Sequence, residues 1–311
     1  MGTPEFAVAP LKALVEGGYN VVAVVTMPDK PSGRGMQLQH SAVKQYALSV
    51  DIPILQPEKL KAPTFIEQLR ALNADLQIVV AFRMLPEVVW DMPPMGTFNL
   101  HASLLPQYRG AAPINWAIIN GERETGITTF LLQHEIDTGA ILFQEKIAIE
   151  ESDNVGTIYE KLMTLGATLV PKTVDALAQG NITPIPQRED HALLHPAPKI
   201  FKETCRIDWN KSAVDITNLV RGLSPYPAAW TRIALPNGKD IDAKILKCAA
   251  TTAETFSKNT GQVTITKEGK LIVHTAGSAV EIEILQPAGK RKMNAQEWLN
   301  GISAPAELHF T

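Results

Sequence analysis

Residues 96–110 read GTFNLHASLLPQYRG. The first part is β-like, and because side chains alternate along a strand, Asn99 and His101 point to the same face. Pro106 and Gly110 then break regular structure, so the strand ends in a loop where a ligand can lie. An amide donor beside an imidazole suits a reaction that develops an oxyanion while it moves a proton. The stretch therefore predicts a strand whose end carries two polar, potentially catalytic side chains beside a loop.

A third polar residue fits the same chemistry. Asp137 precedes Thr138-Gly139, a turn signal that follows the apolar run 127–132. A carboxylate near His101 would hold the ring and favour its charged form. With Asn99, these residues predict an acyl-transfer site that has no nucleophile of its own.

Outward from this stretch, apolar strands alternate with helical patterns. The apolar runs 19–27 and 76–82 are continuous, as in strands covered on both faces, and helical segments at 42–48 and 63–72 lie between them. A longer amphipathic helix, 155–177, ends near Gly180. This alternation predicts the α/β class with a parallel sheet.

The last third of the chain has a different pattern. Four prolines interrupt residues 181–205, which predicts a linker. Short strands are expected at 262–266, 271–275 and 279–285, and Asn294 with Glu297 marks a helix start. A small β-barrel with a helix fits this pattern.

Composition narrows the class of protein. The net charge of the 311-residue chain is −3, so no overall basic field indicates nucleic acid. The two cysteines and seven histidines have no metal-ligand spacing, and no apolar run approaches the length of a membrane span. We expect a cytoplasmic protein with reduced thiols, no metal and no membrane contact.

A lone Asn-x-His pattern on a strand is more often structural than catalytic, but here the surrounding residues resemble the folate-dependent formyltransferase family. Within that family the resemblance is tightest to the members that act on methionyl-tRNA. It is carried by GTPEF (2–6), HASLLP (101–106), RGAAPI (109–114), NGE (120–122), TG (125–126), DTG (137–139), DW (208–209) and RGL (221–223), and it covers nearly the whole chain.

The resemblance implies a fold and a reaction. The expected fold is a Rossmann-like parallel-sheet catalytic domain (1–180), the linker (181–205) and an OB-like barrel that binds tRNA (206–311). The expected reaction moves the formyl group of 10-formyltetrahydrofolate, the co-substrate, to the amino group of methionyl initiator tRNA and releases tetrahydrofolate. Asn99, His101 and Asp137 are its implied catalytic residues. The folate-contacting residues implied are Ser103, Leu104, Leu105, Pro106, Phe82, Met84 and Gln133.

Basic residues are the candidates for nucleic-acid contacts. Arg34 belongs to the loop that the resemblance places at the tRNA acceptor stem, and Lys44 follows it. Lys199 lies in the linker, and Lys290 and Arg291 lie in the barrel. Phosphate contacts of this kind supply affinity without reading sequence. A merely solvated loop is the alternative for Arg34 and Lys44.

The start of the chain departs from the family pattern. Met1 directly precedes Gly2, whereas family members begin with a strand that leads into the GTPEF turn. We expect about six or more apolar residues before Met1 in the natural protein, since a central strand has about that length. Without them, an empty lane should lie beside residues 21–25.

Three other functions stay open on the sequence alone. A related enzyme could formylate a small amine such as an amino sugar or glycinamide ribonucleotide, but a small acceptor needs no second domain. An inactive folate or tRNA binder would not need the catalytic trio. Hydrolysis of formyl-folate would need water to reach the same site. A monomer is the expected state.

Overall fold

The computed structural model describes residues 1–32, 37–187, 194–251 and 259–311. Two compact units make up the chain, and neither is continuous in sequence. The first comprises residues 1–110, 124–147 and 159–196, and the second comprises residues 111–123, 148–158 and 197–311. None of the described helices is long and apolar enough to cross a membrane.

The first unit contains the expected parallel pairs. Its main sheet has the order β5-β6-β7-β8, in which β5 and β6 are parallel and β6 and β7 are antiparallel. A separate parallel pair joins β1 and β4. The bounds are β1 Val24–Val25, β4 Ile54–Leu55, β5 Gln77–Val80, β6 Thr97–His101, β7 Glu124–Leu131 and β8 Ile141–Ala148. The sheet is therefore parallel where the first βαβ pattern predicts it and mixed beyond β6.

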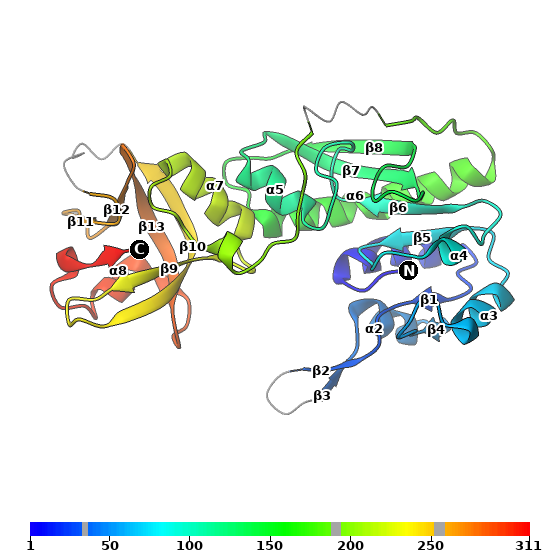
Figure 1. Cartoon of the computed structure of the whole chain (residues 1–311), viewed down its shortest axis with the longest axis horizontal. Helices are drawn as coiled ribbons and strands as arrows, with labels where there is room; N and C mark the ends of the chain where they lie inside the picture. The colour runs from blue at the N-terminus through cyan, green and yellow to red at the C-terminus, as the bar shows by residue number, and fades with distance from the viewer. Residues whose placement is uncertain (33–36, 188–193, 252–258) are drawn as a thin grey trace. The chain divides into compact units, whose positions relative to one another are not determined.

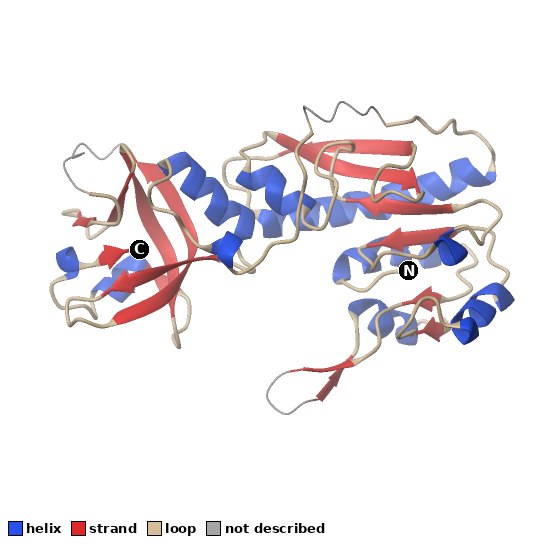
Figure 2. Ribbon diagram, in the orientation of Figure 1, coloured by secondary structure: helices blue, strands red, loops and turns tan. Residues whose placement is uncertain are grey.

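Helices cover these strands (Figures 1 and 2). The predicted helices at 42–48 and 63–72 are confirmed as α2 and α3, within one residue at each end. Ser41 begins α2 as a cap, because its hydroxyl accepts a hydrogen bond from the Lys44 backbone N–H. The helix bounds are α1 Val8–Glu16, α2 Ala42–Ser49, α3 Pro63–Ala71, α4 Glu87–Trp90 and α6 Val155–Ala178, preceded by a 3₁₀ turn, η1, at Glu5–Ala7.

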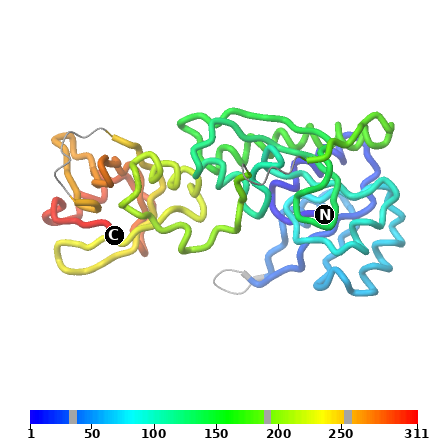
Figure 3. The backbone as a smooth tube through the Cα atoms, turned by 45° about the horizontal axis from the view of Figure 1, so that its top comes forward, coloured from blue at the N-terminus to red at the C-terminus, as the bar shows by residue number. Residues whose placement is uncertain are grey.

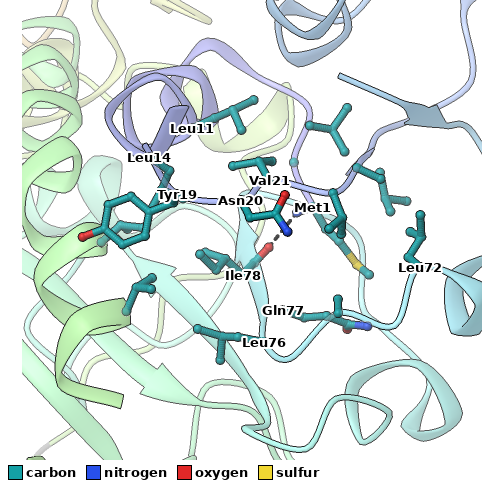
Figure 4. Close-up of a pocket in the computed structure, with 18 of the residues that line it drawn as sticks. Met1, Leu11, Leu14, Tyr19, Asn20, Val21, Leu72, Leu76, Gln77 and Ile78 are labelled. Carbon is teal, nitrogen blue, oxygen red and sulfur yellow. Dashed lines mark hydrogen bonds between the residues drawn. The ribbon is translucent and has the colours of Figure 1, made fainter. Parts of the chain in front are cut away.

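An apolar cavity of about 500 Å³ lies between β1 and β5 (Figure 4). Met1 and Gly2 bridge one end of it: Gly2 N donates to Val25 O (3.0 Å), and Val80 N donates to Met1 O (2.9 Å). The Met1 nitrogen donates to Ile78 O at 2.6 Å. Residues of β1, β5, α1 and α6 line the rest of the cavity. A strand that precedes Met1 stays a prediction.

The second unit is a nearly closed antiparallel barrel with α7 packed on it (Figures 1 and 3). Strand order is β11-β12-β13-β10-β9-β15, and Phe310 N donates to Gly261 O to join the last strand to the start of the first. The bounds are α5 Pro113–Ile119, α7 Ala213–Leu223, β9 Ala229–Ala234, β10 Asp240–Thr251, β11 Val263–Ile265, β12 Leu271–Thr275, β13 Ser278–Pro287, β14 Met293–Asn294, α8 Ala295–Leu299 and β15 His309–Phe310, with 3₁₀ turns η3 at Glu203–Cys205 and η4 at Pro305–Glu307.

The barrel interior follows from strand alternation. Ala229, Thr231 and Ile233 of β9 are fully buried, whereas Trp230 and Arg232 between them lie on the outer face. The expected strands at 262–266, 271–275 and 279–285 are confirmed as β11, β12 and β13. Asn294 precedes α8 as predicted, although its side chain makes no capping hydrogen bond.

Candidate active site

His101 and Asp137 meet in the first unit. His101 ends β6 with only 8% of its side chain exposed, and its Nδ1 lies 3.8 Å from Asp137 Oδ2, whose side chain is 12% exposed. The other ring nitrogen, Nε2, lies 2.9 Å from the Tyr108 carbonyl oxygen. Because a carbonyl only accepts, Nε2 carries the hydrogen. The neutral ring therefore presents an unprotonated Nδ1 toward the carboxylate, and the charged ring forms an ion pair with it.

The loop between β7 and β8 brings Asp137 to this place. Asp137 has a left-handed backbone (φ 57°), which aspartate tolerates better than most residues. Its Oδ2 accepts a hydrogen bond from Gly110 N at 2.9 Å. One carboxylate oxygen is thus oriented by the loop after β6 while it faces the imidazole.

Asn99 lies two residues before His101 in β6, so strand alternation places its side chain on the face that the imidazole occupies. The intervening residue, Leu100, is buried on the other face. Among the described residues, the Asn99 amide makes no side-chain hydrogen bond within the protein. Its N–H donors are therefore available to a ligand.

Gln187 holds the Asp137 loop in position, a role that was not predicted from the sequence. Its amide N–H groups donate to the backbone oxygens of Asp137 (2.9 Å) and Gly139 (2.8 Å). Its Oε1 accepts two hydrogen bonds from the Arg109 guanidinium, at 3.1 and 2.7 Å. A lone glutamine among linker prolines gives no local signal of this role.

Ser103, Leu104, Leu105 and Pro106, the predicted folate-contacting residues, form a tightly bonded loop. Thr128 Oγ1 donates to Ser103 O and accepts from Leu105 N, and the Gln144 amide donates to Leu105 O. Ser103 is fully buried and its hydroxyl donates to Gln107 O. These bonds fix the loop that carries the Tyr108 carbonyl to His101. Ser103 O, Leu105 N and Leu105 O already form hydrogen bonds within the protein, so a ligand would contact mainly side chains of this loop.

The other three predicted folate residues lie on two loops. Phe82 and Met84 follow β5, where Phe82 is half-buried and Met84 is 72% exposed. Arg83 between them binds the carbonyl oxygens of Pro57 and Glu58, and its guanidinium lies 5.5 Å from the Phe82 ring centre. Gln133 begins the Asp137 loop and donates to Thr138 Oγ1. The exposed Met84 offers apolar surface at the end of a parallel strand.

The candidate nucleic-acid residues have different surroundings. Arg34 lies outside the described residues. Lys44 is only 15% exposed, and its ammonium binds Asp29 and Gln56. Hydrogen bonds from Lys44 and Gln56 lower the pKa of Asp29 to about 2. Because Asp29 directly precedes the β2–β3 hairpin (Lys30–Ser32 and Gln37–Gln39), Lys44 anchors the base of that hairpin.

The linker and barrel candidates are exposed. Lys199 lies 5.5 Å from the Phe201 ring centre. Lys290 is in the turn after β13, and Arg291 forms an exposed ion pair with Glu297. Within the described ranges, no group of three or more potential metal ligands occurs. Burial raises the pKa of the Cys248 thiol to about 12, so this cysteine is not an activated nucleophile.

Comparison with known families accounts for both units. The Formyl transferase family model matches residues 1–174, and the model of the formyl transferase C-terminal domain matches residues 199–303. The chain is 58% identical to a methionyl-tRNA formyltransferase of Parabacteroides distasonis, with 99% of this chain and 96% of the relative covered. It is 56% identical to one from Bacteroides thetaiotaomicron, with 97% and 94% covered.

Solved structures share the fold at low sequence identity. WlaRD, a sugar 3N-formyl transferase solved with dTDP and 5-N-formyl-THF, superposes with a TM-score of 0.65 at 19% identity, covering 93% of this chain and 97% of that one. HypX from Aquifex aeolicus in complex with tetrahydrofolic acid gives 0.57 at 21%, covering 81% and 43%. These likenesses support the fold of both units.

Proposed function

The chain belongs to the formyl transferase family, and on that premise we propose that Asn99, His101 and Asp137 carry out its reaction. The chain transfers the formyl group of 10-formyltetrahydrofolate to the amino group of methionyl-tRNA. Methionyl-tRNA is assigned as the acceptor because the chain matches a methionyl-tRNA formyltransferase along 99% of its length. We propose the initiator tRNA as the form used.

The chemistry assigns a role to each residue. The amino nitrogen attacks the formyl carbon, and the carbonyl oxygen becomes an oxyanion that the Asn99 amide stabilises by donating a hydrogen bond. His101 Nδ1, directed at Asp137 and fixed by the Nε2–Tyr108 hydrogen bond, accepts the proton that the amine loses. The resulting imidazolium is stabilised by the Asp137 carboxylate. The proton then returns to the folate nitrogen as its bond to the formyl carbon breaks.

We propose folate contacts at Ser103, Leu104, Leu105, Pro106, Phe82, Met84 and Gln133. The first four lie in the loop that follows β6, beside the catalytic pair. Phe82 and Met84 supply apolar surface, and Gln133 opens the Asp137 loop. Arg34, Lys199, Lys290 and Arg291 are proposed tRNA contacts, whereas the proposed role of Lys44 is to anchor the hairpin that carries Arg34.

The domain roles and cellular setting are proposals as well. We propose catalysis in residues 1–180, a linker at 181–205 and tRNA binding by 206–311. Because aminoacyl-tRNA is a substrate of translation, the reaction belongs in the cytoplasm. A monomer suffices, since one chain supplies all three catalytic residues. Light scattering with size exclusion tests that state.

A formyl-transfer assay with two kinds of acceptor tests the function. Wild-type protein, 10-formyltetrahydrofolate and either charged initiator tRNA or a nucleotide-linked amino sugar should give rapid product with the tRNA only. Preferred transfer to the amino sugar would contradict the assignment. Formate release without an acceptor would identify a hydrolase.

A further inference from the structure

Tyr108 is the residue that fixes the second nitrogen of His101. Its carbonyl oxygen lies 2.9 Å from His101 Nε2, and its side chain is buried. The Tyr108 backbone is left-handed (φ 59°), a conformation that is uncommon for a bulky residue. Because such a conformation persists only where the surroundings hold it, the direction of this carbonyl depends on what contacts Tyr108.

His195, which lies 87 residues later in the linker, contacts the Tyr108 backbone. Tyr108 N donates to His195 O at 2.7 Å, and His195 N donates to the side-chain oxygen of Gln107 at 2.9 Å. The backbone oxygen of Gln107 in turn accepts from the Ser103 hydroxyl. The linker backbone is thus bonded to two consecutive residues of the loop after β6.

The His195 imidazole also lies against the Tyr108 side chain. The two ring centres are 5.8 Å apart with their planes inclined by 49°, a separation typical of favourable aromatic pairs, and His195 Nδ1 lies 3.4 Å from the phenol oxygen. At that distance a hydrogen bond is weak, so packing of the rings is the main contact between the side chains. His195 itself is exposed, so its ring contributes little to a hydrophobic core. Its contact with Tyr108 therefore indicates a local role.

The path from His195 to His101 transmits geometry and not protons. The His195 ring contacts the Tyr108 side chain, whereas His101 contacts the Tyr108 carbonyl. A carbonyl oxygen has no proton to pass on, but it keeps a hydrogen on Nε2 and so leaves Nδ1 of the neutral ring able to accept one. In the other tautomer Nδ1 would carry the hydrogen, and it could not take the proton from the amine.

We propose that His195 is a positioning residue for formyl transfer: it holds Tyr108 so that the Tyr108 carbonyl keeps His101 in the Nε2–H form. The inference rests on the proposed role of His101 and deepens it. Gln187 supports the Asp137 loop from the same linker, so the linker holds both partners of the catalytic pair. The segment that the sequence predicts only as a connection is thus part of the support of the active site.

Steady-state formylation by the full-length protein tests the effect on the rate. His195→Ala removes the ring but keeps the backbone hydrogen bonds, and kcat should fall about ten-fold while the KM values for tRNA and 10-formyltetrahydrofolate stay unchanged. His195→Phe restores an aromatic ring against Tyr108 and should bring kcat back close to that of wild type. Asn181→Ala, which removes another exposed side chain of the linker, is the matched control and should behave as wild type. A wild-type kcat in H195A, or a change confined to KM, would overturn the proposal.

Nitrogen NMR of protein with isotope-labelled histidine reports the tautomer directly. The His101 signals are identified by their absence from the H101A spectrum, at a pH at which the imidazole is neutral. Wild type and H195F should show the hydrogen on Nε2, whereas H195A should show a mixture with the Nδ1–H form. A residue that served only stability would lower the melting temperature without changing this tautomer. The same His101 tautomer in H195A as in wild type would therefore contradict the positioning role, whatever the change in rate.

The NMR experiment needs no folate, no tRNA and no formyl transfer. If wild type fails to formylate methionyl-tRNA but H195A changes the His101 tautomer, the proposed function fails and the positioning of His101 stands. If wild type formylates methionyl-tRNA and H195A keeps both the wild-type kcat and the wild-type tautomer, the inference fails and the function stands.

Discussion

The His101–Asp137 pair and the Lys44–Asp29 pair join a basic group to a carboxylate in different ways. His101 Nδ1 lies 3.8 Å from Asp137 Oδ2, while its second nitrogen is bound to a fixed carbonyl. The Lys44 ammonium contacts Asp29 directly and binds Gln56 as well. A reaction step depends on one geometry, so losing a partner removes most of the rate. An anchor supports the β2–β3 hairpin through several contacts, so losing one weakens tRNA use in part.

His101→Ala should have the largest effect and test the first half of this comparison. Removal of the group that accepts the amine proton should lower kcat by about two to four orders of magnitude. Formylation of charged tRNA at saturating substrates measures it, with circular dichroism as the control for folding. Turnover near that of wild type would rule out the mechanism.

Asp137→Asn keeps the size of the side chain and an oxygen that can accept from Gly110 N, but it removes the charge facing the imidazole. We expect kcat to fall by about one to three orders of magnitude. The double variant H101A/D137N should be hardly slower than H101A, because residues that act as a unit are not additive. If the two substitutions instead lower kcat independently, so that their effects multiply in the double variant, His101 and Asp137 do not act as a unit.

Gln187→Leu extends the comparison to a residue outside the reaction. Leucine of similar size loses the hydrogen bonds to Asp137 O, Gly139 O and Arg109. We expect kcat to drop about ten-fold with the KM for tRNA little changed, since the Asp137 loop loses its support. Gln179→Leu, at an exposed residue just after the end of α6, is the control. A change confined to the tRNA KM would show that Gln187 serves binding instead.

Lys44→Met and Asp29→Asn should have the smallest effects on tRNA use. Together they test whether Lys44 anchors the β2–β3 hairpin or contacts a tRNA phosphate directly. If Lys44 positions the hairpin, each variant should weaken tRNA use a few-fold and the double variant no further. Arg34→Ala, in contrast, should lower the salt slope of tRNA binding by about 1. A lower slope in K44M together with unchanged binding in D29N would make Lys44 a direct contact.

Local sequence signals predict several elements closely. The amphipathic run 155–177 is helical as expected, because its apolar residues recur at helical spacing along α6. The apolar run 19–27, however, forms only the two-residue strand Val24–Val25. It pairs with the equally short β4 on one side, and much of its other side faces the cavity. Strand length depends on partners, which an apolar run does not reveal.

The site was predictable only where it depends on local sequence patterns. Strand alternation places Asn99 and His101 on one face, and both residues lie in β6, the strand expected there. The approach of Asp137 depends on a loop that Gln187, fifty residues later, holds in place. Contacts between distant segments leave no local pattern.

The most direct test of the central claim compares H101A with K44M in single-turnover formylation of methionyl-tRNA while the enzyme concentration is raised to saturation. The account predicts that K44M reaches the wild-type rate once the tRNA is fully bound, whereas H101A stays at least about a hundred-fold slower at any concentration. A saturated K44M rate as low as that of H101A, or full recovery of H101A, would contradict the division between a catalytic pair and an anchoring pair.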